Sequence, residues 1–150
     1  MLFVRGPKGR PVGTKRTRGQ SQEGVFCMKK FFTLRGGVKI PAVGFGTWQT
    51  PDGCIAISSV KTACCCGYRH IDTAAAYHNE GSVGTGIQNV METGVHRSEL
   101  FVTSKLWNTQ RGYDTALAAF EKTLQDLKLT YLDLYLIHWP ASDSRFEDWE

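Results

Sequence analysis

Short apolar runs alternate along the chain with longer segments in which apolar positions recur at helical spacing. Residues 31–34 and 38–40 are strand-like and flank Arg35-Gly36-Gly37, which predicts a short hairpin. Residues 43–48 form the next short run, and we interpret them as a first core strand. From this point onward the pattern predicts alternating strands and helices.

Two predicted helices follow, with a strand between them. Thr50-Pro51-Asp52 is typical of a helix start because proline is favoured early in a helix, and this helix is expected to stop near Gly67. Residues 68–73 predict the second strand. Asn79-Glu80 can cap the second helix, which is expected to end near Gly94.

The third helix has the clearest pattern, and it lies between two predicted strands at residues 100–103 and 131–137. Four apolar residues fall on one face of a 3.6-residue period: Leu117, Phe120, Leu124 and Leu127. The last strand is almost continuously apolar, interrupted by Asp133. Such a run is expected of a strand that is covered on both faces.

Strands that alternate with helices in this way predict an α/β fold with a parallel sheet and right-handed crossovers. Asp72 and Lys105 are 33 residues apart, as are Lys105 and His138, so these residues fall at the C-terminal ends of successive strands. A (β/α)8 barrel builds its active site at that end. A doubly wound sheet also binds ligands there, but residues 44–49 lack the third glycine of its G-x-G-x-x-G turn. The sequence therefore favours the barrel.

Composition and charge narrow the classes of protein. The hydrophobic content of 41% excludes a wholly disordered chain, and no apolar stretch approaches the roughly 18–20 residues of a membrane-spanning helix. The net charge of +4 is concentrated in residues 1–27, which hold six basic residues and one acidic residue. The remainder has 12 basic and 13 acidic residues, so we expect neither a nucleic-acid partner nor a membrane for it.

We interpret residues 1–27 as a disordered basic extension and residues 28–150 as the folded part, because the extension has few groups that can form a core. A targeting peptide and a polyanion-binding arm are the alternatives for the extension. The cysteines are Cys27, Cys54 and the run at 64–66. A triple run lacks the spacing of metal ligands, so we predict no metal site and assign these residues to packing. An odd count without a secretory signal indicates reduced thiols and a cytoplasmic location.

Four polar residues are expected to meet at one end of the sheet: Asp72, Tyr77, Lys105 and His138. Such a set suits proton donation to a carbonyl oxygen. A phenol is a weak acid at neutral pH, and a nearby ammonium such as Lys105 makes Tyr77 a better donor. Asp72 would hold Lys105 charged and oriented, and His138 would bind the carbonyl oxygen.

Each of these residues also has another interpretation. Asp72 can be a helix cap or a member of a structural ion pair, Tyr77 a partly buried surface aromatic, and His138 a hydrogen-bonded core histidine. Lys105 can form a Schiff base, as in barrel aldolases. The joint spacing supports the catalytic interpretation more than any single residue does.

Three tryptophans each follow a predicted strand: Trp48, Trp107 and Trp139. One such residue indicates packing only. Three at one end of a sheet indicate an apolar pocket wall.

Several segments together resemble the aldo-keto reductases. The family's first signature is matched by Gly67-Tyr68-Arg69-His70-Ile71-Asp72-Thr73-Ala74, followed by Glu80 and Val83-Gly84, with Tyr77 in the intervening gap. Residues 44–48, 104–107 and 134–140 match further family segments in order. The resemblance covers roughly residues 29–148.

The resemblance implies a (β/α)8 barrel and NADPH-dependent reduction of aldehydes or ketones. It makes Tyr77 the general acid, assisted by Lys105 and Asp72, with His138 orienting the substrate carbonyl. The residues expected to contact the cofactor are Gly46, Thr47, Trp48 and Asp72. Those expected to contact the substrate are Trp48, Tyr77, Trp107, His138 and Trp139.

The chain departs from the family in length. Family members have eight strands, whereas this sequence ends after the fourth, so we expect an N-terminal half with the hairpin, strands 1–4 and helices 1–3. We expect little or no turnover from this chain alone, unless half barrels pair to close the sheet. A non-catalytic, reductase-like regulatory subunit and a Schiff-base aldolase that uses Lys105 are the alternative functions.

Overall fold

The structure is a computed structural model that describes residues 30–139. Its strands and helices follow the predicted order. In chain order they are β1 (Phe31–Thr33), β2 (Lys39–Pro41), β3 (Phe45–Gly46), α1 (Cys54–Cys65), β4 (His70–Asp72), η1 (Ala75–Tyr77), α2 (Glu80–Glu92), η2 (Arg97–Glu99), β5 (Phe101–Leu106), α3 (Tyr113–Leu127) and β6 (Leu134–Ile137). The predicted extension at 1–27 lies outside the described residues.

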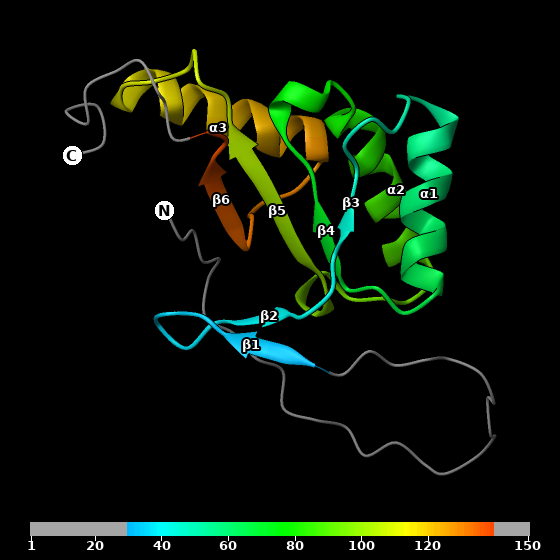
Figure 1. Ribbon diagram of the computed structural model, residues 1–150. Helices are drawn as coiled ribbons and strands as arrows, with labels where there is room; N and C mark the ends of the chain where they lie inside the picture. Colours follow the sequence, from blue (N-terminus) through cyan, green and yellow to red (C-terminus); the bar gives the residue numbers. More distant parts are fainter. Residues whose placement is uncertain (1–29, 140–150) are drawn as a thin grey trace, which may run out of the picture.

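The main sheet has the order β3-β4-β5-β6, and all of its strands are parallel. Helices α1, α2 and α3 lie on one side of it, and the antiparallel β1–β2 hairpin lies at the N-terminal ends of its strands (Figure 1). This arrangement confirms the predicted α/β class. Within residues 30–139 the sheet is open, because β3 pairs only with β4 and β6 only with β5.

The register explains why residues 33 positions apart share one face of the sheet. Asp72 is paired with Thr103, and Lys105 with Leu136. Paired residues on neighbouring strands are thus 31 positions apart in the sequence, two fewer than the spacing of 33. Side chains alternate between faces with a period of two, so an even offset preserves the face. Lys105 and His138 therefore each extend two residues farther toward the C-terminal end than their partner on the preceding strand.

The core lies between the sheet and the helices. Its fully buried side chains include Ile71 and Val102 from the sheet and Val83 and Ile87 from α2. Asp133, which interrupts the apolar run, accepts hydrogen bonds from the backbone N–H of Val102 at 2.9 Å and from the guanidinium of Arg97 at 2.8 Å. This polar residue therefore joins the start of β6 to β5 without leaving an unpaired charge.

Two details of the helices differ from the sequence prediction. Helix α1 begins at Cys54, not near residue 50, because the preceding Gly53 has a φ of 86° and cannot continue a helical turn. Leu117 is 46% exposed although it belongs to the apolar stripe of α3, whose buried residues are Ala119, Thr123 and Leu127. An apolar stripe usually faces the core, so the exposure of Leu117 departs from what this pattern indicates.

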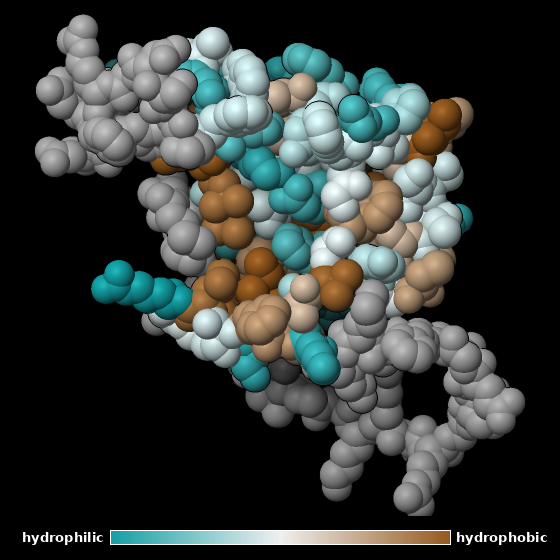
Figure 2. Space-filling model, in the orientation of Figure 1, coloured by the Kyte–Doolittle hydropathy of each residue, from teal (hydrophilic) through white to brown (hydrophobic). Residues whose placement is uncertain are grey.

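The cysteine prediction is also wrong in part. Cys64 is buried, and burial raises the pKa of its thiol to about 11. Cys54, Cys65 and Cys66 are exposed and do not contribute to the core. Hydrophobic side chains also reach the surface in the view of Figure 2. No helix in residues 30–139 is long and apolar enough to cross a membrane.

Candidate active site

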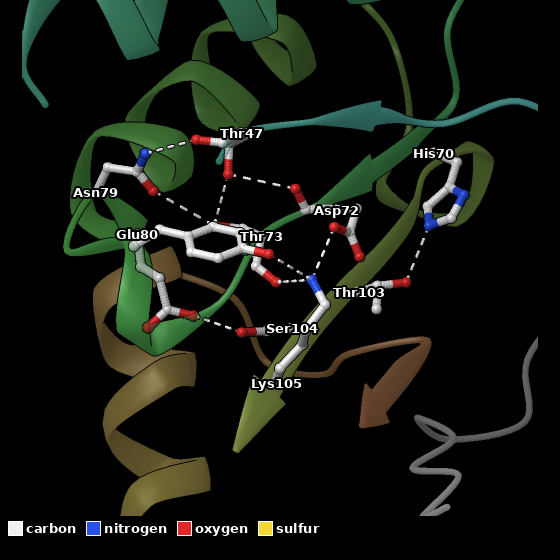
Figure 3. A network of polar contacts seen from close by, with 10 residues as sticks. Thr47, His70, Asp72, Thr73, Asn79, Glu80, Thr103, Ser104 and Lys105 are labelled. Carbon is white, nitrogen blue, oxygen red and sulfur yellow. Dashed lines mark hydrogen bonds and ion pairs between the residues drawn. The ribbon is translucent and has the colours of Figure 1, made fainter. Parts of the chain in front are cut away.

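Lys105 lies near the end of β5 and binds three oxygens at the C-terminal end of the sheet (Figure 3). Its Nζ donates to Asp72 Oδ2 at 2.7 Å, to the Thr73 carbonyl at 2.9 Å and to Tyr77 Oη at 3.2 Å. The Lys105 side chain is 14% exposed and that of Asp72 is 33% exposed. All three donors of the ammonium are therefore used, and one of them is directed at the phenol.

Tyr77 reaches this position from η1, the short turn that follows β4. Its backbone N–H donates to the Ala74 carbonyl at 3.0 Å, and Lys105 Nζ lies 5.0 Å from its ring centroid. The next residue, His78, adopts the left-handed conformation with a φ of 56°. This turn directs the chain into α2, while the phenol stays beside the ammonium.

His138 completes the predicted group. Its ring contacts those of Tyr77 and Trp107 edge to face, with centroids 5.5 and 5.2 Å apart. Desolvation and the positive charge of Lys105 lower the pKa of His138, although Asp72 opposes the shift. The imidazole is therefore neutral at neutral pH, and one of its nitrogens carries a proton that it can donate.

The lowered pKa of His138 leads to a test with two opposite outcomes. Lys105→Met should raise this pKa because it removes a neighbouring positive charge. Asp72→Asn should lower it further because it removes a negative one. NMR titration of the His138 ring protons in the 150-residue chain measures both changes. A shift in the same direction in the two variants would contradict the electrostatic account.

The three tryptophans differ in their surroundings. Trp107 is 37% exposed and packs on His138, whereas Trp48 and Trp139 are 68% and 60% exposed. The structure therefore brings only Trp107 into contact with the candidate catalytic group. That all three form one pocket wall stays a prediction.

A buried polar layer lies beneath this site, and the sequence interpretation did not include it. Thr47, Thr73 and Asn79 are each at most 1% exposed. Thr47 Oγ1 donates to Thr73 Oγ1 at 2.9 Å and to the Asp72 carbonyl at 3.2 Å. Asn79 occupies the predicted N-cap position of α2, but its side chain makes no capping bond to that helix.

Glu80 is a fourth buried residue of this layer. Its carboxylate accepts hydrogen bonds from Ser104 Oγ at 2.6 Å and Thr123 Oγ1 at 3.3 Å, so it joins α2 to β5 and α3. Burial raises the pKa of Glu80, and the two hydroxyl donors oppose this shift. Ser104 directly precedes Lys105, so Glu80 holds the strand next to the candidate site.

The residues predicted to contact a cofactor lie at the ends of two neighbouring strands, Gly46, Thr47 and Trp48 at the end of β3 and Asp72 at the end of β4. A side chain at Gly46 would meet no atom within 4 Å, so there is open space beside this residue. Thr47 is buried and its hydroxyl is used within the protein, whereas Trp48 and part of the Asp72 carboxylate are accessible. No group of His, Cys, Asp or Glu in the described part of the chain has the geometry of a metal site.

The geometry therefore combines a phenol, a charged amine and a neutral imidazole at the end of a parallel sheet. Comparison with known proteins shows the family of the chain. The model of the Aldo/keto reductase family matches residues 42–149. The chain belongs to the aldo/keto reductase family. The predicted resemblance is confirmed.

Curated relatives support this membership and show how much of a family member the chain spans. This chain is 52% identical over 122 residues to glyoxal reductase of Bacillus subtilis, a match that covers 81% of this chain and 43% of the relative. It is 45% identical over 124 residues to the 9,11-endoperoxide prostaglandin H2 reductase of Trypanosoma cruzi, covering 83% and 43%. The chain thus spans about two fifths of the length of the curated relatives it matches.

Solved structures agree with the fold. An aldo/keto reductase from Brucella melitensis matches with a TM-score of 0.71 and 42% identity, covering 78% of this chain and 43% of that one. The aldo-keto reductase of Bombyx mori in complex with NADP matches with a TM-score of 0.70 and 40% identity, covering 79% and 40%. These neighbours are (β/α)8 barrels, and the described part of this chain corresponds to an open section of such a barrel.

Proposed function

We propose that the protein reduces aldehydes or ketones to alcohols with NADPH, and that Tyr77 is the general acid. The observation that carries the proposal is the contact between Lys105 Nζ and Tyr77 Oη at 3.2 Å, beside a neutral His138. An oxidoreductase of the aldo/keto reductase family needs a proton donor for the carbonyl oxygen, and this phenol is the best-placed donor among the described residues.

In this mechanism His138 donates a hydrogen bond to the substrate carbonyl and orients it toward Tyr77. As hydride reaches the carbonyl carbon, the Tyr77 hydroxyl transfers its proton to the oxygen. Lys105 stabilises the phenolate that remains, since its positive charge lies next to the phenol oxygen. Asp72 keeps Lys105 in place through the ion pair at 2.7 Å. Trp48, Trp107 and Trp139 would line the substrate side.

The described residues fit NADPH at its reacting end, where bound NADPH supplies the hydride. Trp48 and the accessible edge of Asp72 are proposed to contact its nicotinamide and ribose, next to the open space at Gly46. The Thr47 hydroxyl is already bonded within the protein. We therefore propose that Thr47 supports the cofactor site indirectly, by holding the loop after β3 in place. The NADP complex of the Bombyx mori neighbour supports this choice of cofactor.

The Schiff-base alternative is disfavoured by the contacts of Lys105. An amine that donates to Asp72, Thr73 and Tyr77 has no lone pair directed at a substrate carbonyl. We also propose a cytoplasmic location, which the free thiols of Cys54, Cys64, Cys65 and Cys66 support.

Turnover is the test of the proposed function. The 150-residue chain should give little NADPH oxidation with an aromatic aldehyde. A fusion enzyme should be active. In it, this chain is followed by the C-terminal part of the Bacillus subtilis glyoxal reductase, which lies beyond the matched segment. Loss of NADPH absorbance measures both reactions, and the intact relative is the positive control.

Three other outcomes are informative: the first concerns only the need for further strands, and the other two would contradict the proposed function. Robust turnover by the chain alone would overturn the argument that it needs further strands. Borohydride trapping of a keto substrate on Lys105 would favour the aldolase. Cofactor binding without turnover in a folded fusion enzyme would favour the regulatory subunit.

A further inference from the structure

We propose that Asn79 is a positioning residue that sets the place of the Tyr77 phenol against Lys105. Only His78 separates Tyr77 from Asn79 along the chain. The Asn79 side chain is 1% exposed and ties this segment to the loop after β3. The inference rests on the proposed function, because it assigns a role to Asn79 only if Tyr77 is the acid.

The contacts of Asn79 are directed away from its own helix. Its Nδ2 donates to the carbonyls of Thr47 and Thr50, both at 2.9 Å, so both amide hydrogens are used. Its Oδ1 lies 3.5 Å from Thr73 Oγ1, which is the donor. We call Thr47, Thr50, Thr73 and Asn79 the Asn79 network. A side-chain cap would stabilise the start of α2, and this asparagine makes none.

The backbone between Tyr77 and Asn79 transmits this restraint. His78 has a φ of 56°, which is costly for a residue with a side chain and persists only where its neighbours determine it. With Asn79 fixed on one side and Tyr77 bonded to Ala74 on the other, this turn has little freedom. Release of Asn79 allows the turn to relax, and the phenol moves with it.

The Asn79 network also reaches the backbone of Asp72 and the amine of Lys105. Thr47 donates to the Asp72 carbonyl through its backbone N–H at 3.0 Å, and the Thr73 carbonyl accepts from Lys105 Nζ at 2.9 Å. The loop after β3 that is proposed to face the cofactor and the turn that carries Tyr77 are thus held by the same buried residues. Asn79 therefore sets the acid relative to the cofactor side of the site.

A structural measurement tests the inference without turnover. In the 150-residue chain, the ring protons of Tyr77 and His138 should give nuclear Overhauser effects, because their centroids are 5.5 Å apart. Asn79→Ala should weaken these signals while the core signals of α2 persist. Gln88→Ala is the matched control, since Gln88 Nε2 also donates to a backbone carbonyl, that of Lys128 at 2.8 Å, on the exposed side of α2. It should leave the ring contact unchanged.

Kinetics of the fusion enzyme supply the second test. Asn79→Ala should lower kcat by about tenfold to a hundredfold, the cost of a misplacement near 1 Å, with the KM for the aldehyde changed less than about threefold. If Asn79→Ala does not fold, Thr73→Val is the second variant. Valine keeps the shape of threonine and has a methyl group in place of the hydroxyl. Thr73→Ser should restore most of the kcat lost in Thr73→Val.

The outcomes separate this inference from the proposed function. An inactive but folded fusion enzyme with the native Asn79 contradicts the proposed function, and the ring contact in the 150-residue chain still reports on the network. An active fusion enzyme whose kcat and ring contact are unchanged in a folded Asn79→Ala variant overturns the positioning role. Where only Thr73→Val folds, an unchanged kcat and ring contact in that variant overturn it equally.

Discussion

Tyr77→Phe should lower the kcat of the fusion enzyme by about a thousandfold, within the usual range for loss of a general acid. The variant removes one oxygen and keeps the ring, so the edge-to-face contact with His138 is preserved. Lys105 loses one of its three acceptors but keeps Asp72 and the Thr73 carbonyl. The fold should therefore persist, and the loss should fall on the proton transfer itself.

The measurement is steady-state NADPH oxidation, with cofactor affinity followed separately by fluorescence. Tyr113→Phe is the matched control, because it removes the same oxygen from a tyrosine that is 83% exposed at the start of α3. It should leave kcat unchanged. Retention of most of the turnover in Tyr77→Phe would show that another group supplies the proton.

The second large effect is expected on stability, from Gly84→Ala. A side chain at Gly84 would lie 2.6 Å from the backbone atoms of Leu127, at the end of α3. The backbone cannot give way as a flexible side chain can, so α2 and α3 must separate. We expect a loss of about 3 kcal/mol in the free energy of unfolding, despite the better helix propensity of alanine. This is a large share of a typical domain's stability.

Gly81→Ala is the matched control on the same helix. A side chain at Gly81 would meet nothing within 4 Å, so only helix propensity changes, and we expect a gain of about 0.5–1 kcal/mol. Urea unfolding of the 150-residue chain, followed by circular dichroism, measures both variants. Equal stability of the Gly84→Ala and Gly81→Ala variants would contradict the close approach of α2 to α3.

Much of the fold could be predicted because its signals are local. The hairpin, the alternation of strands and helices, and the approximate helix ends follow from apolar periodicity, proline and glycine. Leu117 belongs to the apolar stripe of α3, but periodicity records only which face of a helix is apolar. Whether that face is covered depends on tertiary packing, and in the described chain Leu117 is 46% exposed.

The candidate catalytic group could also be predicted from the sequence, but the buried polar residues beneath it could not. Equal spacing places Asp72, Lys105 and His138 on successive strands, and the strand register keeps them on one face. The sequence around Asn79 indicates only a helix cap, since an asparagine directly before a helix usually bonds the backbone N–H groups of that helix. Its actual partners are 29 and 32 residues away, and no local pattern identifies them.

Local patterns in the sequence predict the order of the elements, the α/β class, the likeness to the aldo/keto reductases and the residues that meet at the end of the sheet. The contact between Lys105 and Tyr77, the bonds of Asn79 to a distant loop and the close approach at Gly84 are visible only in the folded chain. The difference lies in the range of the interactions. Periodicity and caps act within a few residues, whereas hydrogen bonds and close packing join atoms that the fold brings together from far along the chain.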